Sequence, residues 1–161
     1  MIADKIVELA AKEVGIREVP VNSNRGKRVQ QYQAATWLEG TGWPWCAAFI
    51  CWLVREALPS ANPPKGFKRP ETAGAWDFEN WATKMAGKGV ERFEAGSKPI
   101  RPGDILVFTF SHIGLAEKAE SRGSVQTIEG NSDASGSREG GGVYRQARRL
   151  SQIREVIRLT F

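Results

Sequence analysis

Residues 45–57 read WCAAFICWLVREA, and they are apolar on every side until Arg55 and Glu56. A helix that is apolar all round is normally buried, so we expect this one to lie at the centre of the fold. Pro44 and the glycines before it interrupt the chain, which places Cys46 in the first turn of the helix. The stretch therefore predicts a central buried helix with a cysteine at its N-terminal end.

Hydrophobic spacing predicts further helices around this one and strands after it. We expect a helix over 2–14, a second helix that is capped by Asn24 and runs to about residue 35, and a third over 72–86. The stretch 130–142 is rich in glycine and serine and predicts a flexible loop. The expected strands are 105–108, 112–119, 125–129, 143–147 and 153–159. Helices followed by an antiparallel meander predict an α+β fold, with N-terminal helices packed on an antiparallel sheet of about five to six strands.

Length and composition limit the possible architectures. A chain of 161 residues predicts one domain, which is large enough to form a hydrophobic core without disulfides or a structural metal. One histidine and two cysteines are too few for most zinc sites, which need about four such ligands, and for a disulfide scaffold. Cys46 and Cys51 are five residues apart, so their Cα atoms would lie roughly 8 Å apart on a helix, beyond the reach of a disulfide. We expect two free thiols.

Charge and the chain ends suggest where the protein acts. The net charge of +5 favours anionic partners, but the sequence contains no nucleic-acid motif, so we expect no nucleic-acid partner. The first residues lack the basic and apolar pattern of an export signal. The longest uncharged stretch, 40–54, is 15 residues long and too short to span a bilayer, so no transmembrane segment is expected. We expect synthesis in the cytoplasm without a signal peptide.

Four residues in three segments of the chain are of types suited to nucleophilic catalysis. At a helix start, the dipole and the free N–H groups favour the thiolate form of Cys46. His112, the only histidine, opens the strand expected at 112–119. Glu129 and Asn131 follow at the end of the next strand, on one face if that strand persists, and either side chain would orient the imidazole. Cysteine, histidine and a polar residue in this order are typical of papain-like thiol enzymes.

The chain resembles the CHAP family (cysteine, histidine-dependent amidohydrolases/peptidases) of peptidoglycan hydrolases. The similar segments are EVGIREVPVNSNRGKRVQQY (13–32), PWCAAFICW (44–52), RPGDILVF (101–108), SHIGLAE (111–117) and TIEGNSD (127–133). The resemblance implies that Cys46 is the nucleophile, His112 the general base and Glu129 the third residue, with Asn131 assisting. It also implies a papain-like fold. Residues 1–161 would then form a single catalytic domain without a separate wall-binding domain.

Two tryptophans lie just before the cysteine in sequence, and we expect Trp43 and Trp45 to line the substrate groove. We expect no cofactor and no metal site. The stretch 39–45 lacks the aspartates of the calcium loop that many phage members carry there. The loop 131–142 starts like an EF-hand, but Gly142 stands where the bidentate glutamate would be.

The resemblance implies hydrolysis of an amide bond in bacterial peptidoglycan, either in the peptides or between N-acetylmuramic acid and L-alanine. A monomeric phage lysis enzyme that reaches the wall after release is the leading interpretation. An injected antibacterial toxin is one alternative, and a papain-like cytosolic protease or deamidase is another. A third, a basic module that only binds glycan or nucleic acid, predicts that Cys46 and His112 are dispensable.

Overall fold

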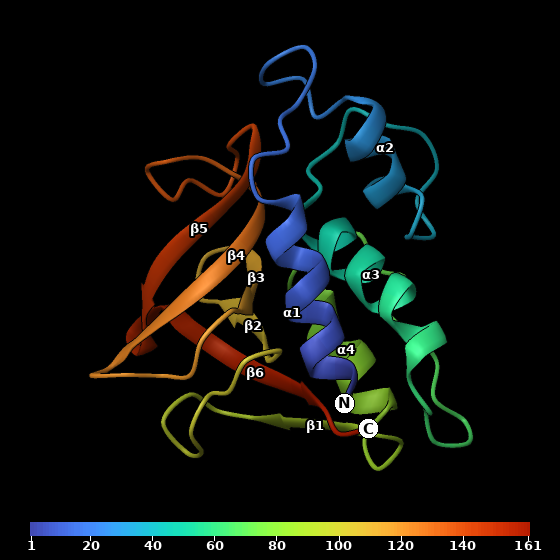
Figure 1. Cartoon of the computed structure of the whole chain (residues 1–161), viewed down its shortest axis with the longest axis vertical. Coiled ribbons are helices and arrows are strands. Elements are labelled where there is room, and N and C mark those ends of the chain that lie inside the picture. The colour runs from blue at the N-terminus through green and yellow to red at the C-terminus, as the bar shows by residue number, and fades with distance from the viewer.

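The computed structural model describes residues 1–161 and contains four α-helices and six β-strands (Figure 1). The helices are α1 (Ile2–Glu13), α2 (Lys27–Gln33), α3 (Cys46–Ala57) and α4 (Asp77–Lys84). The strands are β1 (Val90–Phe93), β2 (Ile105–Phe108), β3 (Ile113–Ala116), β4 (Ser124–Ser132), β5 (Gly142–Arg149) and β6 (Ile153–Leu159). The helices precede the strands in the chain, and the α+β class predicted from the sequence is confirmed.

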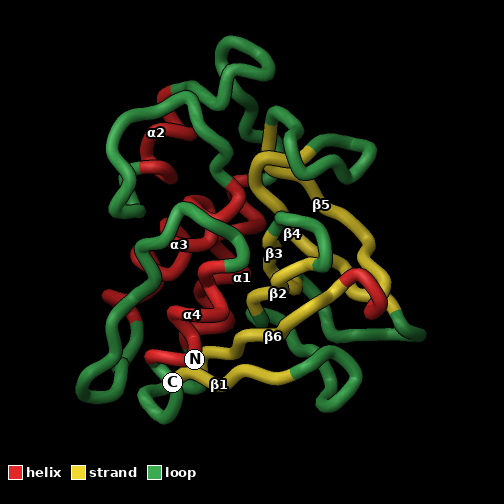
Figure 2. Tube along the Cα trace, turned by 180° about the vertical axis from the view of Figure 1, so that it is seen from behind, coloured by secondary structure: helices red, strands yellow, loops and turns green.

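The six strands form one antiparallel sheet in the order β1-β6-β2-β3-β4-β5. β2, β3, β4 and β5 follow one another as a meander, and the last strand, β6, returns to lie between β1 and β2. Figure 2 shows the helices gathered on one side of this sheet. The hairpin of β4 and β5 is long, and the loop 133–141 at its end lies near the N-terminus of α3.

Apolar side chains cover both faces of the sheet. In β2, Ile105 and Val107 belong to the large core cluster that the helices share with the sheet. Leu106 and Phe108 alternate with them and belong to a smaller cluster on the opposite face. All four are fully buried, so β2 is a central strand.

Helix α3 occupies the centre of the helical layer, as its apolar sequence predicts. Every residue from Cys46 to Val54 is buried. The helix reaches the sheet at Gly130 of β4, where an added Cβ would lie 2.8 Å from the Cβ of Phe49. The missing side chain at Gly130 thus lets α3 pack directly on β4, and it places the N-terminus of α3 close to the catalytic candidates of the sheet.

The structure corrects several of the predicted boundaries. Asn24 does not cap α2; it adopts a turn conformation with φ of 54°, and α2 begins at Lys27 after Gly26. The helix expected over 72–86 is limited to Asp77–Lys84. β1 was not predicted, because two of its four residues are charged and the segment therefore lacks an apolar strand pattern. It lies at the edge of the sheet, where charged residues are common. No helix has both the length and the apolar character needed to cross a membrane.

Candidate active site

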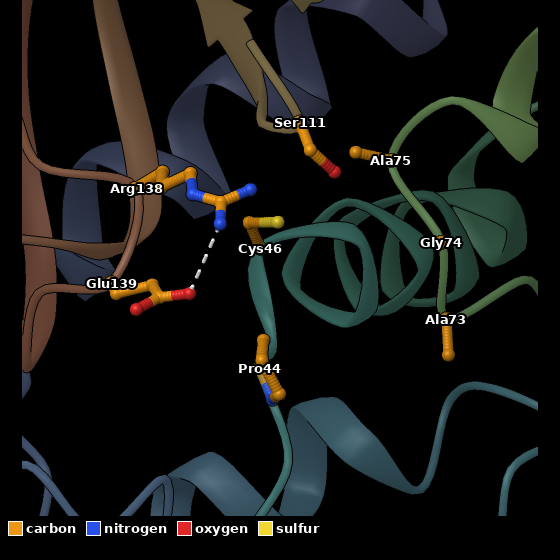
Figure 3. Close-up of a pocket in the computed structure, with 8 residues that line it drawn as sticks. All are labelled: Pro44, Cys46, Ala73, Gly74, Ala75, Ser111, Arg138 and Glu139. Carbon is orange, nitrogen blue, oxygen red and sulfur yellow. Dashed lines mark ion pairs between the residues drawn. The ribbon is translucent and has the colours of Figure 1, made fainter.

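Cys46 opens α3 and faces a small pocket of about 140 Å³ (Figure 3). The residue is 7% exposed, and the structure leaves both cysteines as free thiols, as predicted. Small residues form one wall of the pocket, and the loop 133–141 contributes charged groups. The other lining residues are Pro44, Ala73, Gly74, Ala75, Ser111, Arg138 and Glu139.

His112 lies between β2 and β3 and is completely buried. Its ring stacks on Phe108 and Phe110, with ring centroids 5.7 and 5.8 Å away. Nε2 of His112 lies 2.9 Å from Oε2 of Glu129, whereas Nδ1 has no hydrogen-bond partner. With Nε2 engaged by the carboxylate, Nδ1 is the nitrogen available to exchange a proton with Cys46.

The surroundings of His112 favour its protonated form. Burial by itself lowers the pKa of an imidazole, but the nearby Cys46 and Glu129 outweigh burial and raise the pKa of His112 from 6.5 to about 9. Glu129 shows the complementary effect. Burial raises the pKa of that carboxyl group, and Arg148 and His112 together bring it below its usual value. Both shifts favour the charged forms of the pair, the imidazolium of His112 and the carboxylate of Glu129.

Glu129 accepts four hydrogen bonds in the interior of the protein. Besides His112, the donors are Thr127 Oγ1 at 2.7 Å and two nitrogens of Arg148, at 2.8 and 2.6 Å. Gly114 of β3 makes room for this carboxylate, since a Cβ there would lie 2.7 Å from Cγ of Glu129. Packing and hydrogen bonds thus hold the carboxylate in one orientation.

Asn131 is also buried, but it supports the pocket rather than the histidine. The register of β4 and β5 shifts between Glu129 and Ser132, and Asn131 adopts a φ of 56°. This break in strand alternation turns the side chain so that Nδ2 donates to the backbone oxygen of Arg138, 3.1 Å away. Of the two residues that were equally suited to orient His112, Glu129 is the one hydrogen-bonded to it.

A comparison with protein-family profiles matches residues 38–131 to the CHAP domain. The match covers more than half of the chain and includes Cys46, His112 and Glu129. The protein belongs to the CHAP family. No curated protein and no solved structure matched the chain. CHAP proteins are cysteine- and histidine-dependent amidohydrolases or peptidases, so this protein is a hydrolase of that broad class.

One expectation for the CHAP substrate groove is wrong. Trp45 was expected to contact substrate, but it is fully buried, stacks on Tyr32 and donates its indole N–H to Glu18 at 2.8 Å. It belongs to the core because helix α3 turns its first apolar side chains toward the sheet and α2. Trp43 is half-buried and does not line the pocket beside Cys46, so its contact with substrate stays a prediction.

Two features of the CHAP site were missed in the sequence. Arg148 on β5 holds the Glu129 carboxylate, although it lies 19 residues after Glu129 and outside the matched segment. Arg138 enters the pocket from the loop 133–141, and Figure 3 shows its guanidinium turned toward Cys46 and paired with Glu139 at 3.4 Å. Neither arginine belongs to a recognisable motif; only the sheet register and the loop path bring them to the site.

The CHAP site contains no cluster of three or more cysteine, histidine or acidic side chains suited to a metal ion. In the loop with the partial EF-hand pattern, Oδ1 of Asp133 accepts hydrogen bonds from the backbone N–H groups of Ser135 and Ser137. That carboxylate therefore shapes the turn of the loop.

Proposed function

We propose that the protein hydrolyses an amide bond of bacterial peptidoglycan with Cys46 as nucleophile. The observation that carries the proposal is the buried imidazole of His112. Its Nε2 is held by Glu129, and its Nδ1 is unpaired near the thiol that faces the pocket. This is the nucleophile, base and orienting group required for thiol catalysis.

The reaction follows from these positions. The proton of the Cys46 thiol is held on Nδ1 of His112 in a thiolate–imidazolium pair, and the sulfur attacks the amide carbonyl. The backbone N–H of Cys46, which has no partner within α3, donates to the oxyanion that forms. His112 then protonates the leaving amine, and a thioester remains. Water attacks the thioester, His112 takes a proton from the water, and release of the acid restores the thiolate–imidazolium pair.

The choice of peptidoglycan rests on family membership and on charge. A pocket of about 140 Å³ beside the nucleophile suits a residue of an extended peptide rather than a folded protein surface. The net charge of +5 would concentrate the protein on an anionic cell wall. Within this proposal, the protein is made in the cytoplasm of an infected cell and acts as a phage lysis enzyme on the wall after release.

Digestion of purified peptidoglycan by the wild type and by Cys46→Ser tests the proposal. We expect the wild type to solubilise the wall and Cys46→Ser to lose at least a thousandfold in rate. Cys51→Ser is the matched control, because Cys51 lies in the same helix and only donates to the backbone oxygen of Thr72. It should retain activity.

Mass spectrometry of the products identifies the bond. Free lactyl groups on muramic acid would indicate an amidase, and new peptide termini would indicate an endopeptidase. If Cys46→Ser digests the wall at the rate of the wild type, the mechanism is wrong. Cleavage of an unfolded protein substrate without any digestion of peptidoglycan would instead favour a cytosolic protease.

A further inference from the structure

Arg148 is an arginine that the protein buries beside its candidate catalytic pair. Its side chain is 8% exposed, and the carboxylate it contacts is fully buried. Nε donates to Oε1 of Glu129 at 2.8 Å, and Nη2 donates to Oε2 at 2.6 Å. This fork matches both carboxylate oxygens, and one of them, Oε2, also contacts His112.

Further contacts fix the guanidinium in this position. Nη2 also donates to the backbone oxygen of Gly136 at 3.0 Å, so Arg148 connects the carboxylate to the loop 133–141. The guanidinium lies 5.1 Å from the ring centroids of Phe108 and Phe110, and the same two rings stack on His112. Arg148 and His112 therefore share one carboxylate and one aromatic platform.

The shared carboxylate has a direct consequence for proton transfer. Without Arg148, His112 would be the only cation beside a buried Glu129, and release of its proton would leave an uncompensated buried negative charge. With Arg148 present, the carboxylate keeps a counter-ion when the imidazole becomes neutral. Thiol hydrolysis needs both states of the imidazole in each cycle.

We propose that Arg148 is a positioning residue of the active site, which keeps Glu129 ionised and correctly oriented while it limits how tightly that carboxylate retains the proton of His112. The inference deepens the proposed function, because it concerns the same histidine. Arg148 lies beyond residue 131, outside the segment that matches the family profile.

The charged and titratable groups facing His112 are few. Cys46 approaches from α3, and Glu129 and Arg148 approach from β4 and β5. Arg138 and Glu139, which line the pocket beside Cys46, form an ion pair with each other. Besides His112 itself, Arg148 is the charged group that bonds directly to the Glu129 carboxylate, so its charge is the one to change.

The test is an NMR titration of the imidazole, which is unambiguous because His112 is the only histidine. It needs no substrate, so its outcome is independent of whether peptidoglycan is the target. We expect Arg148→Met to bind the His112 proton at least tenfold more tightly than the wild type. Arg148→Gln should bind the His112 proton as tightly as Arg148→Met does, because glutamine keeps a hydrogen-bond donor but lacks the charge. The glutamine variant therefore serves as the test if the methionine variant does not fold. Arg148→Lys keeps the charge and should stay within threefold of the wild type.

Arg145→Met is the matched control. Arg145 lies on the same strand and forms an equivalent fork with Glu117 at the surface, at 2.8 to 3.0 Å. This variant should leave the titration unchanged. Thermal melting first shows whether the methionine and glutamine variants are folded. If the folded variants titrate like the wild type or bind the proton more weakly, the inference is wrong and Arg148 only stabilises the fold.

Discussion

Gly114 is the position at which one added methyl group should separate folding from catalysis. In Gly114→Ala, the new Cβ would lie 2.7 Å from Cγ of Glu129, which is 0.7 Å short of the 3.4 Å where ordinary contacts begin. Moving the carboxyl group away from His112 by that amount would stretch their 2.9 Å hydrogen bond to about 3.6 Å, beyond hydrogen-bond range. We expect kcat to fall by about ten- to a hundredfold.

The fold should tolerate this change better than the reaction does. Overpacking of a core by one methyl group costs about 1–3 kcal/mol of unfolding free energy, which lowers the Tm by roughly 2–4 °C per kcal/mol in a chain of this size. Peptidoglycan digestion and thermal melting measure the two effects. The control is Gly141→Ala, where a Cβ would have no neighbour closer than 3.6 Å. If Gly114→Ala digests peptidoglycan as fast as Gly141→Ala does, Glu129 is not held as we describe.

Three further predictions concern the same network. Glu129→Gln should lower the pKa of His112 from about 9, because the variant loses the carboxylate charge that opposes the effect of burial; an NMR titration that stays near 9 would contradict this. Iodoacetamide should modify Cys46 and leave Cys51 unmodified, since burial holds the pKa of Cys51 far above its usual value; mass spectrometry of the peptides distinguishes the two sites. The folded-state pKa of His112 lies above the unfolded value of 6.5, so the stability it contributes is complete below pH 6.5 and is lost as the pH rises through 9. In urea unfolding experiments, the unfolding free energy of the wild type should fall by up to about 3 kcal/mol over this pH range. If it does not change with pH, in the wild type as in His112→Gln, the assignment is refuted.

Much of the site could be predicted because it depends on local signals. The apolar run 45–57 needs only helical geometry to place Cys46 at a buried helix start, and α3 begins at that residue. The alternation and turn residues around His112 and Glu129 predicted two neighbouring strands. Their antiparallel pairing brought the two side chains together, as β3 and β4 show.

Other parts of the site could not be predicted, because they depend on register and packing. Asn131 loses its place beside Glu129 through a shift in the β4–β5 register. Arg148 reaches the Glu129 carboxylate because the hairpin sets Arg148 opposite Val125, on the face that also carries Thr127 and Glu129. Trp45 is buried because of where α2 and the sheet close on α3, which its neighbours in sequence do not reveal.

The amino-acid sequence by itself determined the α+β class, the helix that presents Cys46, and the presence of a single histidine and a following acidic residue. These follow from hydrophobic periodicity and composition, which act over a few residues. Only the tertiary structure decided that Glu129 rather than Asn131 holds His112, and that Arg148 shares that carboxylate. Such choices depend on strand register and on the space left by Gly114 and Gly130. At these positions a shift of less than 1 Å in a side chain is enough to break a hydrogen bond or to cause a steric clash.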